Sequence, residues 1–182
     1  MDLSDRIISA FPSELKRSSA ALADLLGAEG AALSPHSFRV LVQGETLEIP
    51  ERLYVARAAF ENRDGIGSCL LTRHHNGFVR QRALEETLSL KQPWTAPFIV
   101  RLVGEYVIEI IEQIDAAFDQ ISDAQLGAFV GTNPAFIRLT RARVTSYWNS
   151  YFRKTPPGEY VGFRVMDRIE ATGQQSRKRG PR

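Results

Sequence analysis

Apolar residues recur at three- and four-residue intervals along most of the chain, which is the periodicity of amphipathic helices. Prolines, glycines and small polar residues separate these stretches and mark where helices begin and end. The predicted helices cover most of residues 2–28, a stretch from Pro50 to 62, both sides of residues 74–77, and residues 97–119, 123–131, 134–153 and 159–171. The chain is therefore predicted to be mainly α.

Residues 38–49 depart from the helical spacing. Phe38, Val40 and Val42 alternate with the residues between them, and the alternation resumes at Leu47 and Ile49 after a Gln-Gly turn signal. This pattern predicts one short β-hairpin near residues 38–49. Because an isolated hairpin is only marginally stable, we expect it to pack against helices.

The composition is that of a globular protein. The chain has 182 residues, of which 43% are hydrophobic and 24% charged, enough for a single globular helical domain over residues 1–172. No stretch of about 18 apolar residues is present, so no membrane span is expected. Cys69 is the only cysteine, which excludes an internal disulfide and a cysteine-based zinc site. With no secretory signal at the start, a cytoplasmic location is the simplest expectation.

The basic charge is concentrated at the C-terminus. Four of the 23 Lys and Arg residues lie within residues 177–182, and the other 19 are outnumbered by 21 acidic residues. Residues 173–182 are predicted to be a disordered basic tail. The body of the protein thus lacks the overall basic excess that is typical of nucleic-acid-binding domains.

Two adjacent histidines, His74 and His75, precede an Asn-Gly pair. Neighbouring positions on a helix point about 100° apart, so the two imidazoles are poorly placed to share a metal ion. The only other histidine is His36, and no set of ligands is complete. We therefore interpret residues 74–77 as a turn between two helices, without a metal, cofactor or catalytic role.

Two helix–turn–helix stretches, residues 70–84 and 126–142, share a pattern. Each has an apolar helix end, a short polar turn with Asn, and then Phe, a β-branched residue and Arg, in Phe78-Val79-Arg80 and Phe136-Ile137-Arg138. In this respect residues 64–153 resemble HEAT-like helical repeat proteins. The resemblance implies antiparallel helical pairs stacked side by side, and an irregular helical bundle is the alternative.

The predicted helix over residues 97–119 has two contrasting faces. One face carries the apolar side chains Val103, Tyr106, Val107, Ile110, Ile111, Ile114 and Phe118. The other carries the acids Glu105, Glu109, Glu112 and Asp119, joined by Asp123, within a sector of roughly 80°. Such a stripe is either a solvated face, or paired with Arg138, Arg141 and Arg143 of a neighbouring helix, or an acidic ridge that attracts a basic partner.

The helix predicted from Pro134 combines aromatic and basic residues. Its cations are Arg138, Arg141, Arg143, Arg153 and Lys154, and no acid lies between Ala124 and Gly158. Aromatic and basic side chains together can bind single-stranded nucleic acid. However, Phe136, Ile137, Thr140, Val144, Tyr147, Trp148 and Tyr151 share one side of the helix, which also indicates core packing.

These observations favour a non-enzymatic, protein-binding role, as an adaptor or an inhibitor. The sequence has no Gly-rich phosphate loop, serine nucleophile motif or paired-carboxylate site. The acidic ridge is the predicted contact, and its partner is another protein with a basic surface. The alternative is nucleic-acid binding through the basic helix and the tail.

Overall fold

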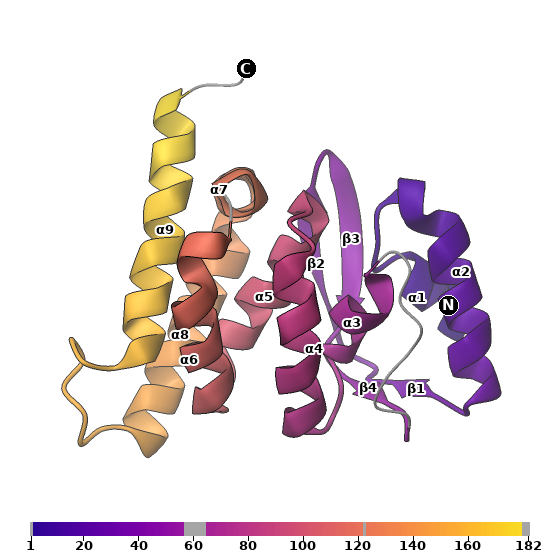
Figure 1. Cartoon of the computed structure of the whole chain (residues 1–182), viewed down its shortest axis with the longest axis horizontal. Helices are drawn as coiled ribbons and strands as arrows, with labels where there is room; N and C mark the ends of the chain where they lie inside the picture. The colour runs from indigo at the N-terminus through magenta and orange to yellow at the C-terminus, as the bar shows by residue number, and fades with distance from the viewer. Residues whose placement is uncertain (1, 57–64, 122, 180–182) are drawn as a thin grey trace. The chain divides into compact units, whose positions relative to one another are not determined.

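The computed structural model describes residues 2–56, 65–121 and 123–179 (Figure 1). It is mainly helical with two small antiparallel sheets, which confirms the predicted fold class. The chain divides into two compact units, residues 1–90 and 91–182, where the sequence predicts a single domain over residues 1–172. No local pattern in the sequence marks the division.

Unit 1 begins with helices α1 (Leu3–Ile8) and α2 (Lys16–Ala28), which pack against each other (Figure 1). The carboxylate of Asp2 caps α1 by accepting a 2.8 Å hydrogen bond from the backbone N–H of Asp5. Helix α1 also packs against strand β3, and Ile7 is fully buried. The helical prediction for residues 2–28 thus holds, with a short break before α2.

The hairpin consists of β2 (Ser37–Val42) and β3 (Glu45–Pro50), which pair antiparallel with Val40 opposite Leu47. Gln43 and Gly44 both have positive φ, at 51° and 86°, as a two-residue type I′ turn requires. Alternate side chains are buried, including Val40 and Leu47. The predicted hairpin is therefore confirmed, one residue longer at each end.

The helix predicted from Pro50 onward is wrong in its first part. Pro50 ends β3, and Leu53–Tyr54 forms strand β4, which pairs with β1 (Ala32–Leu33). Residues 57–62 of this prediction lie outside the described residues. Leu53 exchanges backbone hydrogen bonds with Arg73 and His75, so a tertiary contact holds this segment extended.

Helices α3 (Ile66–Leu71) and α4 (Gly77–Ser89) complete unit 1 and pack against each other. Their connection contains the two histidines, as predicted. The side chain of Asn76 caps α4, accepting a 2.9 Å hydrogen bond from the backbone N–H of Phe78.

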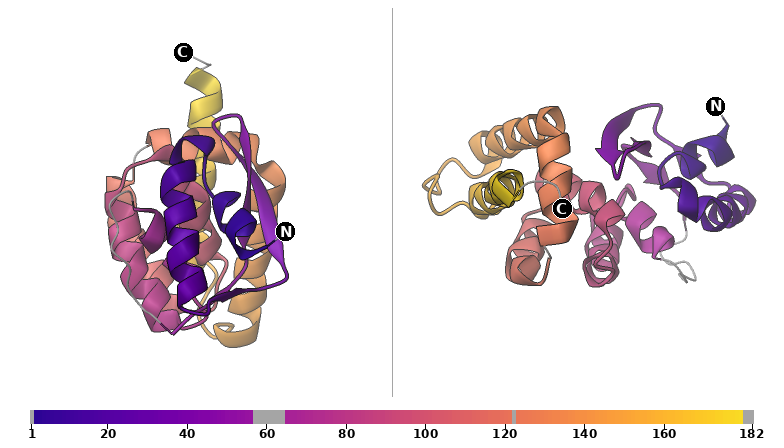
Figure 2. Two further views of the ribbon diagram at one scale, coloured as in Figure 1. Left: turned by 90° about the vertical axis from the view of Figure 1, so that its right-hand side faces the viewer. Right: turned by 90° about the horizontal axis from the view of Figure 1, so that it is seen from above.

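Unit 2 contains α5 (Ala96–Val103), α6 (Ile108–Ala117), α7 (Asp123–Thr132), α8 (Pro134–Tyr151) and α9 (Val161–Arg179), with short 3-10 turns Pro93–Thr95 and Phe118–Gln120. Helix α9 contacts α5, α6, α7 and α8, and Figure 2 shows it seen along its axis from above. Every residue of α5 is buried. Thus α9 ties the other helices of the unit together.

The continuous helix predicted over residues 97–119 is wrong. Helix α5 ends at Gly104, and α6 begins only after Val107. Gly104 packs closely against α8, where an added Cβ would lie 3.3 Å from Thr140. The apolar periodicity continues across the break, so only Gly104 in the sequence indicates it.

The C-terminal helix is longer than the sequence predicts. Helix α9 continues to Arg179 and so includes residues 173–179 of the segment predicted to be a disordered tail. Gly173 lies against Val130 of α7, where even one added methyl group would collide. This close crossing of α7 and α9 explains why the helix continues past the polar change in sequence.

Candidate functional site

The predicted acidic ridge is not one surface. Glu105 lies in the break between α5 and α6 and is only 2% exposed. Glu109 and Glu112 are exposed on α6. Asp119 is exposed but its carboxylate is paired with Arg168 of α9. The four residues therefore do not act as a single line of free charges.

Helix α9 supplies the arginines that pair with the acids of α6. Asp115 accepts hydrogen bonds from Arg164 at 2.8 and 3.0 Å, and Arg168 lies 3.4 Å from the same carboxylate. The hydrogen bond from Arg164 is the main reason that the pKa of Asp115 lies below its usual value. The Arg168 guanidinium also lies 4.1 Å from the centre of the Phe118 ring. Asp115 and Asp119 are thus paired with arginines of α9.

The basic residues of α8 also have different roles. Arg141 pairs with Glu170 at 2.7 Å and with Asp167 at 2.6 Å, so its charge is used within unit 2. The hydrogen bond to Glu170 is the main reason that the pKa of Arg141 is raised. Arg143 is half-buried, whereas Arg138, Arg153 and Lys154 are exposed. Only the last three retain the solvent access that the nucleic-acid interpretation needs.

His74 has a structural role in unit 1. It is 3% exposed, its Nε2 lies 2.8 Å from the carbonyl oxygen of Val55, and its Nδ1 accepts a hydrogen bond from the backbone N–H of Asn76. This pattern assigns the proton of a neutral ring to Nε2. Burial lowers the pKa of His74, which favours this neutral form. Both ring nitrogens are therefore engaged within the fold.

Three exposed aromatic side chains lie in and next to the connection between α3 and α4, and we call them the aromatic turn: Tyr54 of β4, His75 of the connection and Phe78 of α4. The rings of Tyr54 and His75 are stacked at 5.6 Å, and Phe78 is 82% exposed in the first turn of α4. The fully buried Arg80 donates hydrogen bonds to the carbonyl oxygens of His74 and His75, which fixes the backbone of the turn.

A second aromatic group, the tyrosine row, lies in unit 2: Tyr106, Tyr147 and Tyr151. The ring centres of Tyr106 and Tyr147 are 5.9 Å apart, and those of Tyr147 and Tyr151 are 6.3 Å apart with planes 21° from parallel. Tyr106 is 55% and Tyr151 is 69% exposed. Both were assigned to buried faces from their spacing, and that assignment is wrong. Because the chain breaks after α5, Tyr106 lies next to Tyr147 of α8. No local sequence pattern indicates this contact.

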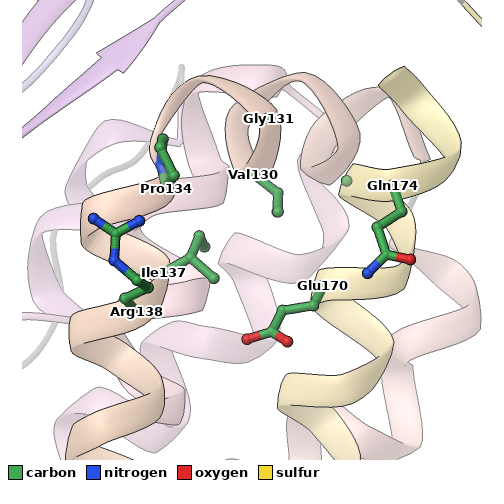
Figure 3. A pocket seen from close by; sticks show the side chains of 8 residues that line it. Val130, Gly131, Pro134, Ile137, Arg138, Glu170 and Gln174 are labelled. Carbon is green, nitrogen blue, oxygen red and sulfur yellow. The ribbon is translucent and has the colours of Figure 1, made fainter. Parts of the chain in front are cut away.

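An open cavity of about 270 Å³ lies among α7, α8 and α9 (Figure 3). Its lining residues are Val130, Gly131, Pro134, Ile137, Arg138, Glu170, Gly173 and Gln174. Arg138 and Glu170 are the ionisable groups of this lining, and Glu170 is already paired with Arg141. Ligand pockets usually enclose about 300–1,000 Å³, so this cavity is small as well as open.

The chain matches no protein-family model, no curated protein and no solved structure. Among the described residues, no group of three or more His, Cys, Asp or Glu side chains is arranged to hold a metal ion. Over the same residues, every helix is too short or too polar to cross a lipid bilayer. Any assignment of function therefore rests on the surfaces described above.

Proposed function

We propose that this protein is a protein-binding module, an adaptor or an inhibitor, and that the aromatic turn of unit 1 is its contact. The observation that carries the proposal is the 82% exposure of Phe78. Burying a phenylalanine side chain is worth roughly 1.5–3 kcal/mol relative to leaving it in water. A partner with an apolar pocket for this ring would gain most of that energy.

The hydrogen bonds next to Phe78 support this role because they restrict the motion of its backbone before a partner binds. Asn76 caps the helix next to Phe78, and Arg80 holds the preceding carbonyl groups. A backbone hydrogen bond of 2.9 Å joins the N–H of His75 to the carbonyl oxygen of Leu53. A pre-ordered aromatic anchor loses little entropy on binding, which is typical of interface hot spots.

The partner is proposed to carry a basic surface, which the free part of the predicted ridge would attract. Glu109 and Glu112 remain exposed on α6, and no ion pair involves them among the described residues. Charges of this kind raise the association rate more than the affinity. The resemblance to HEAT-like pairs supports the same class of function.

The test is a quantitative affinity capture from the native host with three forms of the full chain. Phe78→Ser should lose a specific partner that the unchanged protein retains. Leu41→Ser is the matched control, because Leu41 is an exposed apolar residue of the same unit at 38% exposure. Both variants should unfold at the midpoint of the unchanged protein. If every captured protein is retained equally by the two variants, the aromatic turn is not the contact.

The charge contribution is measured separately once a partner is purified. Glu109→Gln with Glu112→Gln should slow association at low salt and leave dissociation nearly unchanged. If the association rate does not depend on these two residues, the proposal that the partner has a basic surface is wrong.

A further inference from the structure

We infer that the tyrosine row of unit 2 is a stacking platform for single-stranded nucleic acid, a second binding function that is independent of the aromatic turn. Aromatic side chains bind successive bases of a single strand without sequence preference, because every base has a π-face. The tyrosine row offers three rings in succession, with centres 5.9 and 6.3 Å apart.

Two rings of the row are nearly parallel, and the third, Tyr106, is tilted by 54° from Tyr147. Tyr147 and Tyr151 are one helical turn apart on α8, and their planes differ by only 21°, so they present similar faces. Tyr151 and Tyr106, at the two ends of the row, are 69% and 55% exposed. Tyr147, between them, is partly buried. Exposed apolar patches of this kind can mark a binding site.

The charge near the C-terminal end of α8 favours an anionic occupant. Arg153 and Lys154 follow Tyr151 after one intervening residue, just beyond the end of α8, and both are exposed. No acid lies between Ala124 and Gly158, so α8 has no acidic residue of its own to oppose a phosphate. Arg141 is excluded from this role by its ion pairs with α9. Phosphates of the strand are therefore expected at the Tyr151 end.

The acids near the other end limit the platform. Glu105 is buried beside Tyr106, and Glu109 is exposed in the first turn of α6. An exposed carboxylate repels phosphate, so the site is expected to end at Tyr106. We therefore expect a short site that takes about one base on each tyrosine.

Fluorescence anisotropy of the full chain with labelled oligothymidylate and a mixed-sequence RNA, at low salt, tests the inference. Tyr106→Ala and Tyr151→Ala should each weaken binding roughly 5- to 150-fold. Tyr151→Phe keeps the ring and should bind as the unchanged protein does. Leu139→Ala is the matched control on the same helix, since Leu139 is 50% exposed but lies outside the row. Unchanged circular dichroism would show that each variant is folded.

Two further measurements separate stacking from general attraction. Arg153→Gln with Lys154→Gln should reduce the slope of log affinity against log salt by about 1.4, the value for two phosphate contacts on a single strand. Irradiation with an oligonucleotide that contains bromodeoxyuridine should place adducts on the tyrosine row of the unchanged chain. Absence of binding at low salt, or binding that survives Tyr106→Ala and Tyr151→Ala unchanged, would overturn the inference. Equal displacement of the oligonucleotide by polyglutamate would also overturn it, in favour of an acidic protein partner.

Discussion

Replacement of Gly173 by alanine should destabilise unit 2, although alanine is the better helix former. Gly173 lies within α9, and an ideal Cβ there would approach the Cβ of Val130 in α7 to 2.9 Å, nearer than real Cβ atoms come. Alanine gains about 0.8–1.0 kcal/mol over glycine within a helix. Forcing an extra methyl group into a packed interior costs about 1–3 kcal/mol, so the collision should win.

The expected net loss is about 1 kcal/mol, which lowers the melting temperature of a 60–100-residue domain by roughly 4–8 °C. Trp94 and Trp148, the only two tryptophans, both lie in unit 2, so tryptophan fluorescence follows its unfolding. Denaturation by urea, monitored in this way, gives the free energy directly. Val130→Ala removes the Cγ1 of Val130, the atom nearest to the added Cβ, but keeps the Val130 Cβ, so Gly173→Ala should cost less, though still something, in that background.

Gly27→Ala is the matched control, which measures the gain in helix propensity without a collision. Gly27 is exposed in α2, and the nearest atom to its added Cβ would be 4.0 Å away, on Leu3. This change should raise the stability of unit 1 by up to about 1 kcal/mol, followed by circular dichroism. The reasoning is refuted if Gly173→Ala raises the midpoint of unit 2 as Gly27→Ala raises that of unit 1.

Three other perturbations have defined outcomes. Asn76→Ala should cost about 1 kcal/mol in urea unfolding by removing the cap of α4, whereas Asn76→Asp should retain most of the stability. Burial lowers the pKa of His74 in the folded protein. Its contribution to the free energy of unfolding should therefore be complete above its pKa in the unfolded chain, about 6.5, and should decline as the pH falls below that value. His74→Gln should flatten this pH dependence of the unfolding free energy, and His75→Gln should leave it in place. Tyr160→Phe removes a buried hydroxyl with no hydrogen-bond partner among the described residues, so unit 2 should keep or gain up to about 1 kcal/mol; a loss would show that the hydroxyl is satisfied.

Local signals in the sequence were sufficient where neighbouring residues decide the structure. The Gln43-Gly44 turn and the alternation on both sides of it specify the hairpin, because positive φ at both turn residues fits a two-residue loop. Pro134 begins α8 at the position where the missing N–H of proline costs nothing. Asn133 occupies the expected cap position but donates its amide to the carbonyl oxygen of Phe129 instead.

The sequence could not show which faces distant segments leave free. Glu109 and Glu112 lie on a helix as predicted, whereas Glu105 lies in the break between α5 and α6. In addition, α9 pairs Asp115 and Asp119 with its arginines and Arg141 with its acids. A charge pattern along one helix cannot show which other helix will cover it. The same limit applies to Tyr106, whose spacing continues that of a buried face across the break at Gly104.

The sequence by itself determined a mainly helical chain, the hairpin over residues 38–49 and the turn at the two histidines, because periodicity and turn chemistry are properties of neighbouring residues. Only the tertiary structure decided that α5 and α6 are separate helices, that α9 neutralises charges on α6 and α8, and that three tyrosines from two segments form one row. The physical reason is that burial and ion pairing depend on which segments pack together, and that packing joins residues far apart in the chain.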